Sequence, residues 1–406
     1  MTVIFKLVLL NFIYGTCSVN VLILGGNGFI GSHVVENFKN LDYNVTLINR
    51  GNVYFDTKKR MEINAFRTFT CDRNTLLKKS CHSLLTDDFY DFVLDFSSYQ
   101  KQHIEQTIDI LKSRVGLYIF LSTDAVYELK SSKSHTSTHA PRYLREDGVR
   151  SELDYQTKKM SKYASNKLDC EKALVKQRQL SGFPYVILRL ATVIGERDTT
   201  LRWWVYQTLM KVHKYINVKV PLPIAVMKLN HSMVYVGDVA AAIMKILKKS
   251  EVMHDQTINL AFKEDINLEK ILQSIADCLK MSNVTYDYNI DTAWFKYPAV
   301  QVGPIDTYKA KNLLEWSPIT FLNASNITCN FFERAMTDFH YVKDKELMLA
   351  ELLEEALPDS FEDELQFFDV LKKEYGIEVM KGIDLGVDEP ENMVTDGNTD
   401  KLKLEL

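Results

Sequence analysis

Residues 19–32 read VNVLILGGNGFIGS, and this stretch decides the fold of the N-terminal half of the chain. The apolar run 19–24 predicts a strand buried on both faces, and the glycines after it predict a tight turn into a helix. Gly25 permits the turn, Gly28 lets the backbone approach a pyrophosphate, and Gly31 lets the helix pack closely on the sheet. The free N–H groups and the positive end of that helix would bind the pyrophosphate. We therefore expect a dinucleotide-binding loop, whose other residues are Gly26, Phe29 and Ile30.

Short apolar runs continue downstream and alternate with segments of helical spacing. The runs that predict strands are 45–49, 66–71, 92–96, 117–122 and 185–190, and those that predict helices are 103–111 and 161–181. Such alternation predicts an α/β fold with a doubly wound parallel sheet. We expect this domain to span residues 18–195, with 231–250 returning to the sheet, and a smaller C-terminal substrate-binding lobe to comprise 196–230 and 251–339. The polar stretch 128–155 predicts a surface loop over the site.

The end of the second predicted strand bears on the choice of cofactor. Enzymes that use NAD usually place Asp or Glu here, bonded to the ribose 2′-hydroxyl. This chain has the neutral Asn49, followed by Arg50, which can pair with a 2′-phosphate through two hydrogen bonds. The pattern favours NADP(H) over NAD(H), although Arg50 could also be an exposed turn residue. Asp72, just after the third strand, is placed to meet the adenine or to serve as a turn residue.

Three further residues predict acid–base chemistry. Tyr163 and Lys167 lie four residues apart in YASNK, so they share one face of a helix. An ammonium group beside a tyrosine favours the phenolate, which can accept a proton from an alcohol while hydride moves at the carbon. Lys167 would also hold the nicotinamide ribose. Thr123 ends the fifth strand, at the sheet edge where ligands bind, and its hydroxyl can orient the substrate oxygen.

Together these residues resemble the extended short-chain dehydrogenase/reductases, the NAD-dependent epimerase/dehydratase family. The likeness runs from about residue 19 to 335 and includes YVILR at 185–189, VYVGDVA at 234–240, DTYKA at 306–310 and LEWSP at 314–318. The resemblance implies a Rossmann-type fold, catalytic positions at Thr123, Tyr163 and Lys167, and a small-molecule substrate such as a sugar or sugar nucleotide. Similar proteins commonly form homodimers through the helices equivalent to 101–112 and 161–181.

The chain also departs from this family. Many members that use UDP-sugars carry Asn where this chain has Thr192, and His231-Ser232 replaces a frequent Arg-Asp, which argues against a nucleotide sugar. Dehydratases place Asp and Glu side by side after the Thr, whereas this chain has Asp124 and Ala125. We therefore expect net oxidation or reduction at one carbon. The alternatives are an epimerase-like isomerase and a non-catalytic NAD(P)-binding scaffold.

Arg202-Trp203-Trp204 resembles family members of uncertain substrate. The two tryptophans could line the pocket or stack on a ring, and packing in the core is the other interpretation.

Composition limits the class of protein. Net charge is −4 over 406 residues, which gives no reason to expect a nucleic-acid partner. Residues 340–406 hold 19 acidic and 7 basic side chains, so this tail carries −12 and the rest of the chain about +8. A mildly basic charge on residues 1–339 suits a ligand that bears phosphate.

The two termini predict a location. Residues 1–17 have a lysine, an apolar run and small residues, as a signal peptide does, and no later stretch is apolar enough to span a bilayer. The final residues, KLEL, resemble an endoplasmic-reticulum retrieval signal. We expect residence in the endoplasmic-reticulum lumen, and N-x-S/T sequons at Asn44, Asn283, Asn323 and Asn326 are compatible with a glycoprotein.

The cysteines show no spacing typical of a metal site. Five of them follow residue 17, namely Cys71, Cys81, Cys170, Cys278 and Cys329. We expect buried thiols, with one or two disulfides as the alternative.

Overall fold

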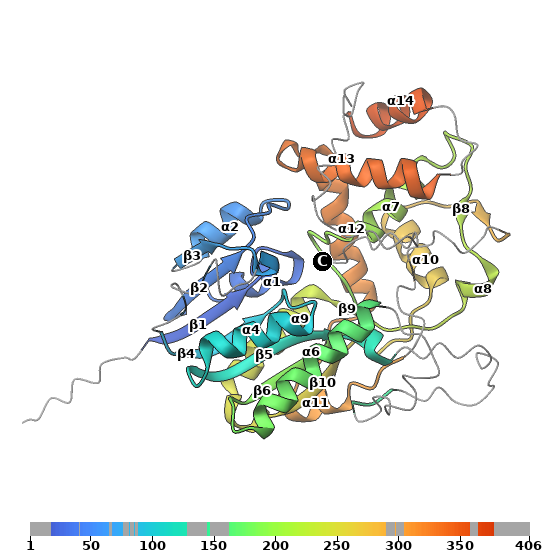
Figure 1. The fold of residues 1–406 in the computed structure, drawn as a ribbon. Helices are drawn as coiled ribbons and strands as arrows, with labels where there is room; N and C mark the ends of the chain where they lie inside the picture. Colours follow the sequence, from blue (N-terminus) through green and yellow to red (C-terminus); the bar gives the residue numbers. More distant parts are fainter. Residues whose placement is uncertain are drawn as a thin grey trace, which may run out of the picture.

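A seven-stranded parallel sheet forms the centre of the first domain, in the order β10-β6-β5-β4-β1-β2-β3 (Figure 1). The computed structural model describes residues 18–39, 41–64, 67–75, 81, 85, 88–127, 144–146, 162–289, 297, 304–357 and 364–376. The strands are β1 (Val19–Leu24), β2 (Tyr43–Asn49), β3 (Arg67–Thr70), β4 (Tyr90–Asp95), β5 (Val115–Thr123), β6 (Tyr185–Leu190) and β10 (Gln256–Leu260). The expected Rossmann-type parallel sheet is confirmed.

Helices cover both faces of this sheet, which explains the continuous apolar strands. In β1, Val21 and Ile23 pack into one hydrophobic cluster and Leu22 and Leu24 into another, because successive side chains of a strand point to opposite faces. The first cluster includes side chains of α1 (Phe29–Glu36) and α9 (Val236–Lys248), and the second includes side chains of α4 (Lys101–Leu111) and α6 (Lys162–Gln179). The remaining helices of this region are α2 (Thr57–Asn64) and α11 (Tyr308–Leu314).

The strand that completes the sheet differs from the sequence expectation. Residues 231–250, predicted to return to the sheet, form β9 (Met233–Tyr235) and α9, and β9 pairs with β7 (Thr192–Ile194) outside the seven-stranded sheet. The seventh strand is instead β10, which pairs with β6 and belongs to the range predicted for the smaller lobe. A short apolar run such as 233–236 suits a strand in either sheet, so its pattern does not select the partner.

The second lobe is built mainly from helices (Figure 1). They are α7 (Arg202–Val212), α8 (Ile224–Met227), α10 (Leu268–Cys278) and α12 (Phe321–Thr337), beside the short strands β8 (Val220–Pro221) and β11 (Tyr286–Asp287). Trp203 and Trp204 are both fully buried in this core, where the Trp204 ring stacks on Phe332 with 5.0 Å between centroids. The core-packing interpretation of these tryptophans is therefore confirmed.

This lobe extends past the predicted boundary at residue 339. Helix α13 (Val342–Glu351), a π-helical turn (Leu352–Ala356) and α14 (Glu364–Tyr375) follow α12 and lie on the same lobe (Figure 1). Met348, Leu349, Phe367 and Leu371 are buried in the core that holds the tryptophans. The first part of the predicted acidic tail is thus part of a packed domain.

Two disulfides correct the expectation of free thiols. Cys71 pairs with Cys81, and Cys278, the last residue of α10, pairs with Cys329 of α12. Cys170 is a buried free thiol. Sequence spacing did not reveal the second pair because its partners meet only when the two helices pack.

Some expectations concern residues that the structure does not describe. They are the signal peptide at 1–17, the KLEL end, and the loop 128–155 apart from residues 144–146. Within the described part of the chain, no helix is both long enough and apolar enough to cross a membrane.

Candidate active site

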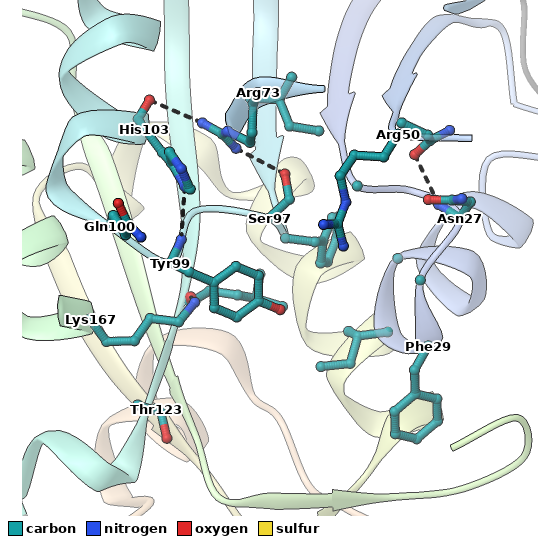
Figure 2. Close-up of a pocket in the computed structure, with 18 of the residues that line it drawn as sticks. Asn27, Phe29, Arg50, Arg73, Ser97, Tyr99, Gln100, His103, Thr123 and Lys167 are labelled. Carbon is teal, nitrogen blue, oxygen red and sulfur yellow. Dashed lines mark hydrogen bonds between the residues drawn. The ribbon is translucent and has the colours of Figure 1, made fainter. Parts of the chain in front are cut away.

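A cleft of about 810 Å³ lies at the carboxyl ends of the parallel strands. Every predicted site residue except Gly26 lines it. In Figure 2, Asn27, Phe29 and Arg50 lie at one end of the cleft and Lys167 and Thr123 at the other, with the Tyr99 ring between them. Segments distant in the sequence therefore meet along one continuous cleft.

The glycine loop has the geometry of a close-approach site. Gly25 has φ +84°, a conformation that favours glycine. A Cβ on Gly31 would lie 2.4 Å from the carbonyl oxygen of Gly25, so the helix can approach the strand only without a side chain there. A Cβ on Gly28 would come no nearer than 3.7 Å to another atom, and that residue caps the N-terminus of α1 without a side-chain hydrogen bond. The loop therefore leaves room for a ligand at the helix N-terminus, as a dinucleotide pyrophosphate requires.

The two site residues predicted at the end of β2 have different roles. Asn49 is buried, and its Oδ1 accepts a hydrogen bond of 3.1 Å from the backbone N–H of Asn27. Its amide therefore braces the glycine loop. Arg50 is exposed and lines the cleft, where a charged ligand can meet its guanidinium (Figure 2).

A buried ion pair supports the cleft beside Asp72, and we did not predict it. Arg73 pairs with Asp95 at 2.8 Å and donates to Ser97 Oγ at 2.9 Å and to the carbonyl of His103 at 3.0 Å (Figure 2). Burial opposes ionisation of Asp95, but the Arg73 charge and hydrogen bonds from Ser98 and Tyr118 bring its pKa below the ordinary value. Asp72 lines the cleft as predicted, and its Oδ1 accepts the Asn74 N–H at 2.9 Å.

Lys167 is held in one orientation. Its Nζ donates to the carbonyls of Ser98 and Leu121, each at 2.9 Å, and lies 4.5 Å from the centroid of the Tyr99 ring. The residue is 4% exposed, and burial lowers the pKa of its side chain to about 8. The lysine therefore reaches the cleft from α6 with its position set by two backbone oxygens.

Tyr163 and Thr123 complete this end of the cleft. Tyr163 is half-buried near the start of α6, and its ring lies 6.4 Å from that of Tyr99. Thr123 ends β5, and its Oγ1 accepts the backbone N–H of Ala125 at 3.2 Å. The cleft thus brings together a phenol, an ammonium and a hydroxyl.

The cleft is also lined by residues that the acid–base motifs do not indicate. Thr192 and Val193 follow β6, and Thr200 and Arg202 precede and begin α7. These side chains supply hydroxyls and a guanidinium, which can bind hydroxyl-rich or phosphate-bearing ligands.

Comparison with known proteins agrees with this geometry. Residues 21–261 match the profile of the NAD dependent epimerase/dehydratase family. A Bacillus subtilis (strain 168) protein described as the uncharacterized UDP-glucose epimerase YtcB is 26% identical over 329 residues, covering 74% of this chain and 94% of that protein.

Solved structures show the same fold. UDP-glucuronic acid 4-epimerase from Bacillus cereus in complex with NAD aligns with a TM-score of 0.59 at 20% identity, covering 78% of this chain and 99% of its own. The dTDP-glucose 4,6-dehydratase of Bacillus anthracis in complex with NAD aligns with a TM-score of 0.58 at 16% identity, covering 78% of this chain and 97% of its own.

Proposed function

The chain belongs to the NAD dependent epimerase/dehydratase family, and from this premise we propose that it catalyses hydride transfer at an alcohol or carbonyl carbon. Tyr163 moves the proton in this reaction. The observation that carries the proposal is the convergence of Tyr163, Lys167 and Thr123 at one end of a cleft whose other end is the glycine loop. A protein that only bound the cofactor as a scaffold would have no need of all three groups.

The residues of the cleft fit a nicotinamide dinucleotide. The space beside Gly28 and the N-terminus of α1 suit the pyrophosphate. When bound, the nicotinamide supplies or accepts the hydride. Lys167, fixed by two carbonyls, presents a cation that favours the phenolate of Tyr163. The phenolate accepts the hydroxyl proton of an alcohol, or the phenol donates a proton to a carbonyl oxygen, while Thr123 orients that oxygen.

For the substrate we propose a sugar or sugar nucleotide, although Thr192 and His231-Ser232 depart from the residues of many family members that use UDP-sugars. Support comes from the names of the relatives, which include a UDP-glucose epimerase and a UDP-glucuronic acid 4-epimerase. Thr192, Thr200 and Arg202 line the same cleft as the acid–base groups, and their hydroxyls and guanidinium suit a polyhydroxylated or phosphorylated molecule.

For the cofactor we propose a preference for NADP(H). The support is Arg50, exposed at the end of β2 and lining the cleft, together with the absence of a carboxylate at Asn49. The structures of relatives named above contain NAD, so this preference would distinguish the chain from them.

For the outcome we propose net oxidation or reduction. Ala125 stands where a dehydratase has the second acidic residue, so one half of the acid–base pair needed for elimination of water is missing. Epimerisation is the second candidate, favoured by the names of the relatives. Mass spectrometry of products from a sugar-nucleotide panel tests both. A change of two hydrogens supports net redox, an isomer supports epimerisation, and a product lighter by one water contradicts both.

We also propose that the protein resides in the endoplasmic-reticulum lumen. The signal-like residues 1–17 and the KLEL end support this address, and two disulfides suit an oxidising compartment. Removal of residues 403–406 is expected to send the protein into the medium. A full-length chain that stays in the cytosol would contradict this location.

A further inference from the structure

The loop between β2 and α2 forms one wall of the cleft and is fastened to the glycine loop. Arg50, Asn52 and Tyr54 line the cleft from this segment. Asn27 Nδ2 donates to the carbonyl of Asn52 at 2.5 Å, and Asn52 Nδ2 donates to the Tyr54 hydroxyl at 3.1 Å. This fixes the first half of the loop to the first domain.

The second half of the loop is fastened to the other lobe through Phe55. Phe55 is 6% exposed, and its ring lies 5.3 Å from the Tyr341 ring and 5.9 Å from the Trp204 ring, inside the core of the second lobe. Its backbone adopts φ +47°, which a non-glycine residue rarely does without outside support. That support is Asp344 of α13, whose two carboxylate oxygens each accept the Phe55 N–H at 3.0 Å.

Neighbouring contacts strengthen this attachment. Asp56 pairs with Arg197 through two bonds of 2.6 and 3.2 Å, and the Arg197 guanidinium lies over the ring of Phe331. Lys345, next to Asp344, donates to the carbonyl of Met336 at 2.7 Å and so ties α13 to α12. Asp344 therefore projects from a helix that is itself anchored.

We propose that Asp344 is a positioning residue for the cofactor: it holds the loop 50–56 so that Arg50, Asn52 and Tyr54 face the adenosine half of the dinucleotide. The loop that follows the second strand of such a fold meets the adenosine ribose, so the loop's position affects binding of that half first. The proposal rests on the proposed function, because it assumes that the cleft binds a nicotinamide dinucleotide. It makes α13, a helix of the second lobe, a determinant of cofactor affinity, although Asp344 is not among the residues that line the cleft.

The test compares three variants with the wild type at a temperature where all are folded. Asp344→Ala removes both acceptors, Asp344→Asn keeps one oxygen, and Glu346→Gln is the matched control, an exposed acid on the same helix. The probes are ADP-ribose and its 2′-phosphate, which contain the adenosine half alone, measured by calorimetry. Hydrogen–deuterium exchange of residues 50–57 reports on the loop itself.

We expect Asp344→Ala to bind both probes about tenfold more weakly, because a hydrogen bond to a charged group contributes on that order. Hydrogen exchange should become faster in residues 50–57 and stay unchanged in β1 and β5. A general loss of stability would instead speed exchange in the strands as well. Asp344→Asn should show a smaller effect and Glu346→Gln none.

Two failures can be told apart. If Asp344→Ala and Asp344→Asn both bind the probes as tightly as wild type, the positioning role is wrong and the proposed function stands. If the wild type binds neither probe nor any nicotinamide dinucleotide, both the proposed function and the positioning role are overturned.

Discussion

The Nζ of Lys167 lies 4.5 Å from the centroid of the Tyr99 ring while it donates to the carbonyls of Ser98 and Leu121. An aromatic face and two carbonyl oxygens are favourable surroundings for a cation, yet burial still lowers the pKa of this lysine to about 8. The ammonium that we propose to favour the Tyr163 phenolate is thus fixed in place and close to neutralisation at mildly alkaline pH.

This pKa predicts how stability depends on pH. The folded-state pKa is about 8, below the ordinary value of 10.5, so the unfolded chain binds more protons between these two values. Stability of the cofactor-free protein should therefore rise with pH from about 8 to 10.5, and Lys167→Met should remove this contribution to the slope. Chemical denaturation at a series of pH values measures it. A slope identical in the two proteins would contradict the assignment.

Two glycines of the loop should respond differently to alanine. Gly28→Ala should fold normally, because its Cβ meets nothing nearer than 3.7 Å, but should lose most of its affinity for dinucleotides as the methyl group occupies the pyrophosphate site. Gly31→Ala should lower the melting temperature, because its Cβ would lie 2.4 Å from the Gly25 oxygen. Thermal unfolding and cofactor titration separate the effects. Normal binding by folded Gly28→Ala would contradict the pyrophosphate site.

Arg50→Ala should bind NADP(H) about tenfold more weakly and NAD(H) unchanged, since an exposed guanidinium contributes less than a buried one. Asn49 provides a contrast, because Asn49→Ala removes the brace on the Asn27 N–H and should weaken both nucleotides alike. Dissociation constants from fluorescence titration measure both effects. Equal affinities for the two cofactors in the wild type and in Arg50→Ala would refute the NADP preference.

The Cys278–Cys329 disulfide joins α10 to α12 across 51 positions of sequence. Replacing both cysteines by serine should lower the free energy of unfolding by about 2–4 kcal/mol, since the cross-link restricts the unfolded chain. Denaturant unfolding with and without reductant measures this loss. In the double variant, reductant has no Cys278–Cys329 disulfide to break. A wild type whose unfolding does not respond to reductant would contradict the proposed stabilisation by this disulfide.

Local motifs made part of the site predictable. The glycine loop lies within a single turn, and Tyr163 and Lys167 are one helical turn apart, so sequence spacing alone gives their geometry. Arg73 and Asp95 could not be paired in this way, because they meet only once β3 and β4 take their places in the sheet. The DFVLDFSS stretch at 91–98 was the available signal, since it places an acidic residue at the end of an apolar strand.

The same limit applied to the outer parts of the fold. The run 256–260 is short, and tertiary packing decides whether it pairs with β6 or joins the second lobe. Composition set residues 340–406 apart from the second lobe as an acidic tail, but α13 buries Met348 and Leu349 and binds Phe55 from 289 positions away. The overall composition of a segment does not show that one face of a helix within it is apolar.

In the proposed reaction, Tyr163 moves a proton while hydride passes between the cofactor and a substrate carbon. The most direct measurement is the absorbance of reduced nicotinamide when the purified protein, loaded with oxidised cofactor, is mixed with members of a sugar and sugar-nucleotide panel under single-turnover conditions. We predict a rise in absorbance with at least one member in the wild type, whether the turnover ends in net oxidation or in epimerisation. The rise should be lost in Tyr163→Phe at unchanged cofactor affinity. A rise of equal rate in Tyr163→Phe would show that this tyrosine does not move the proton.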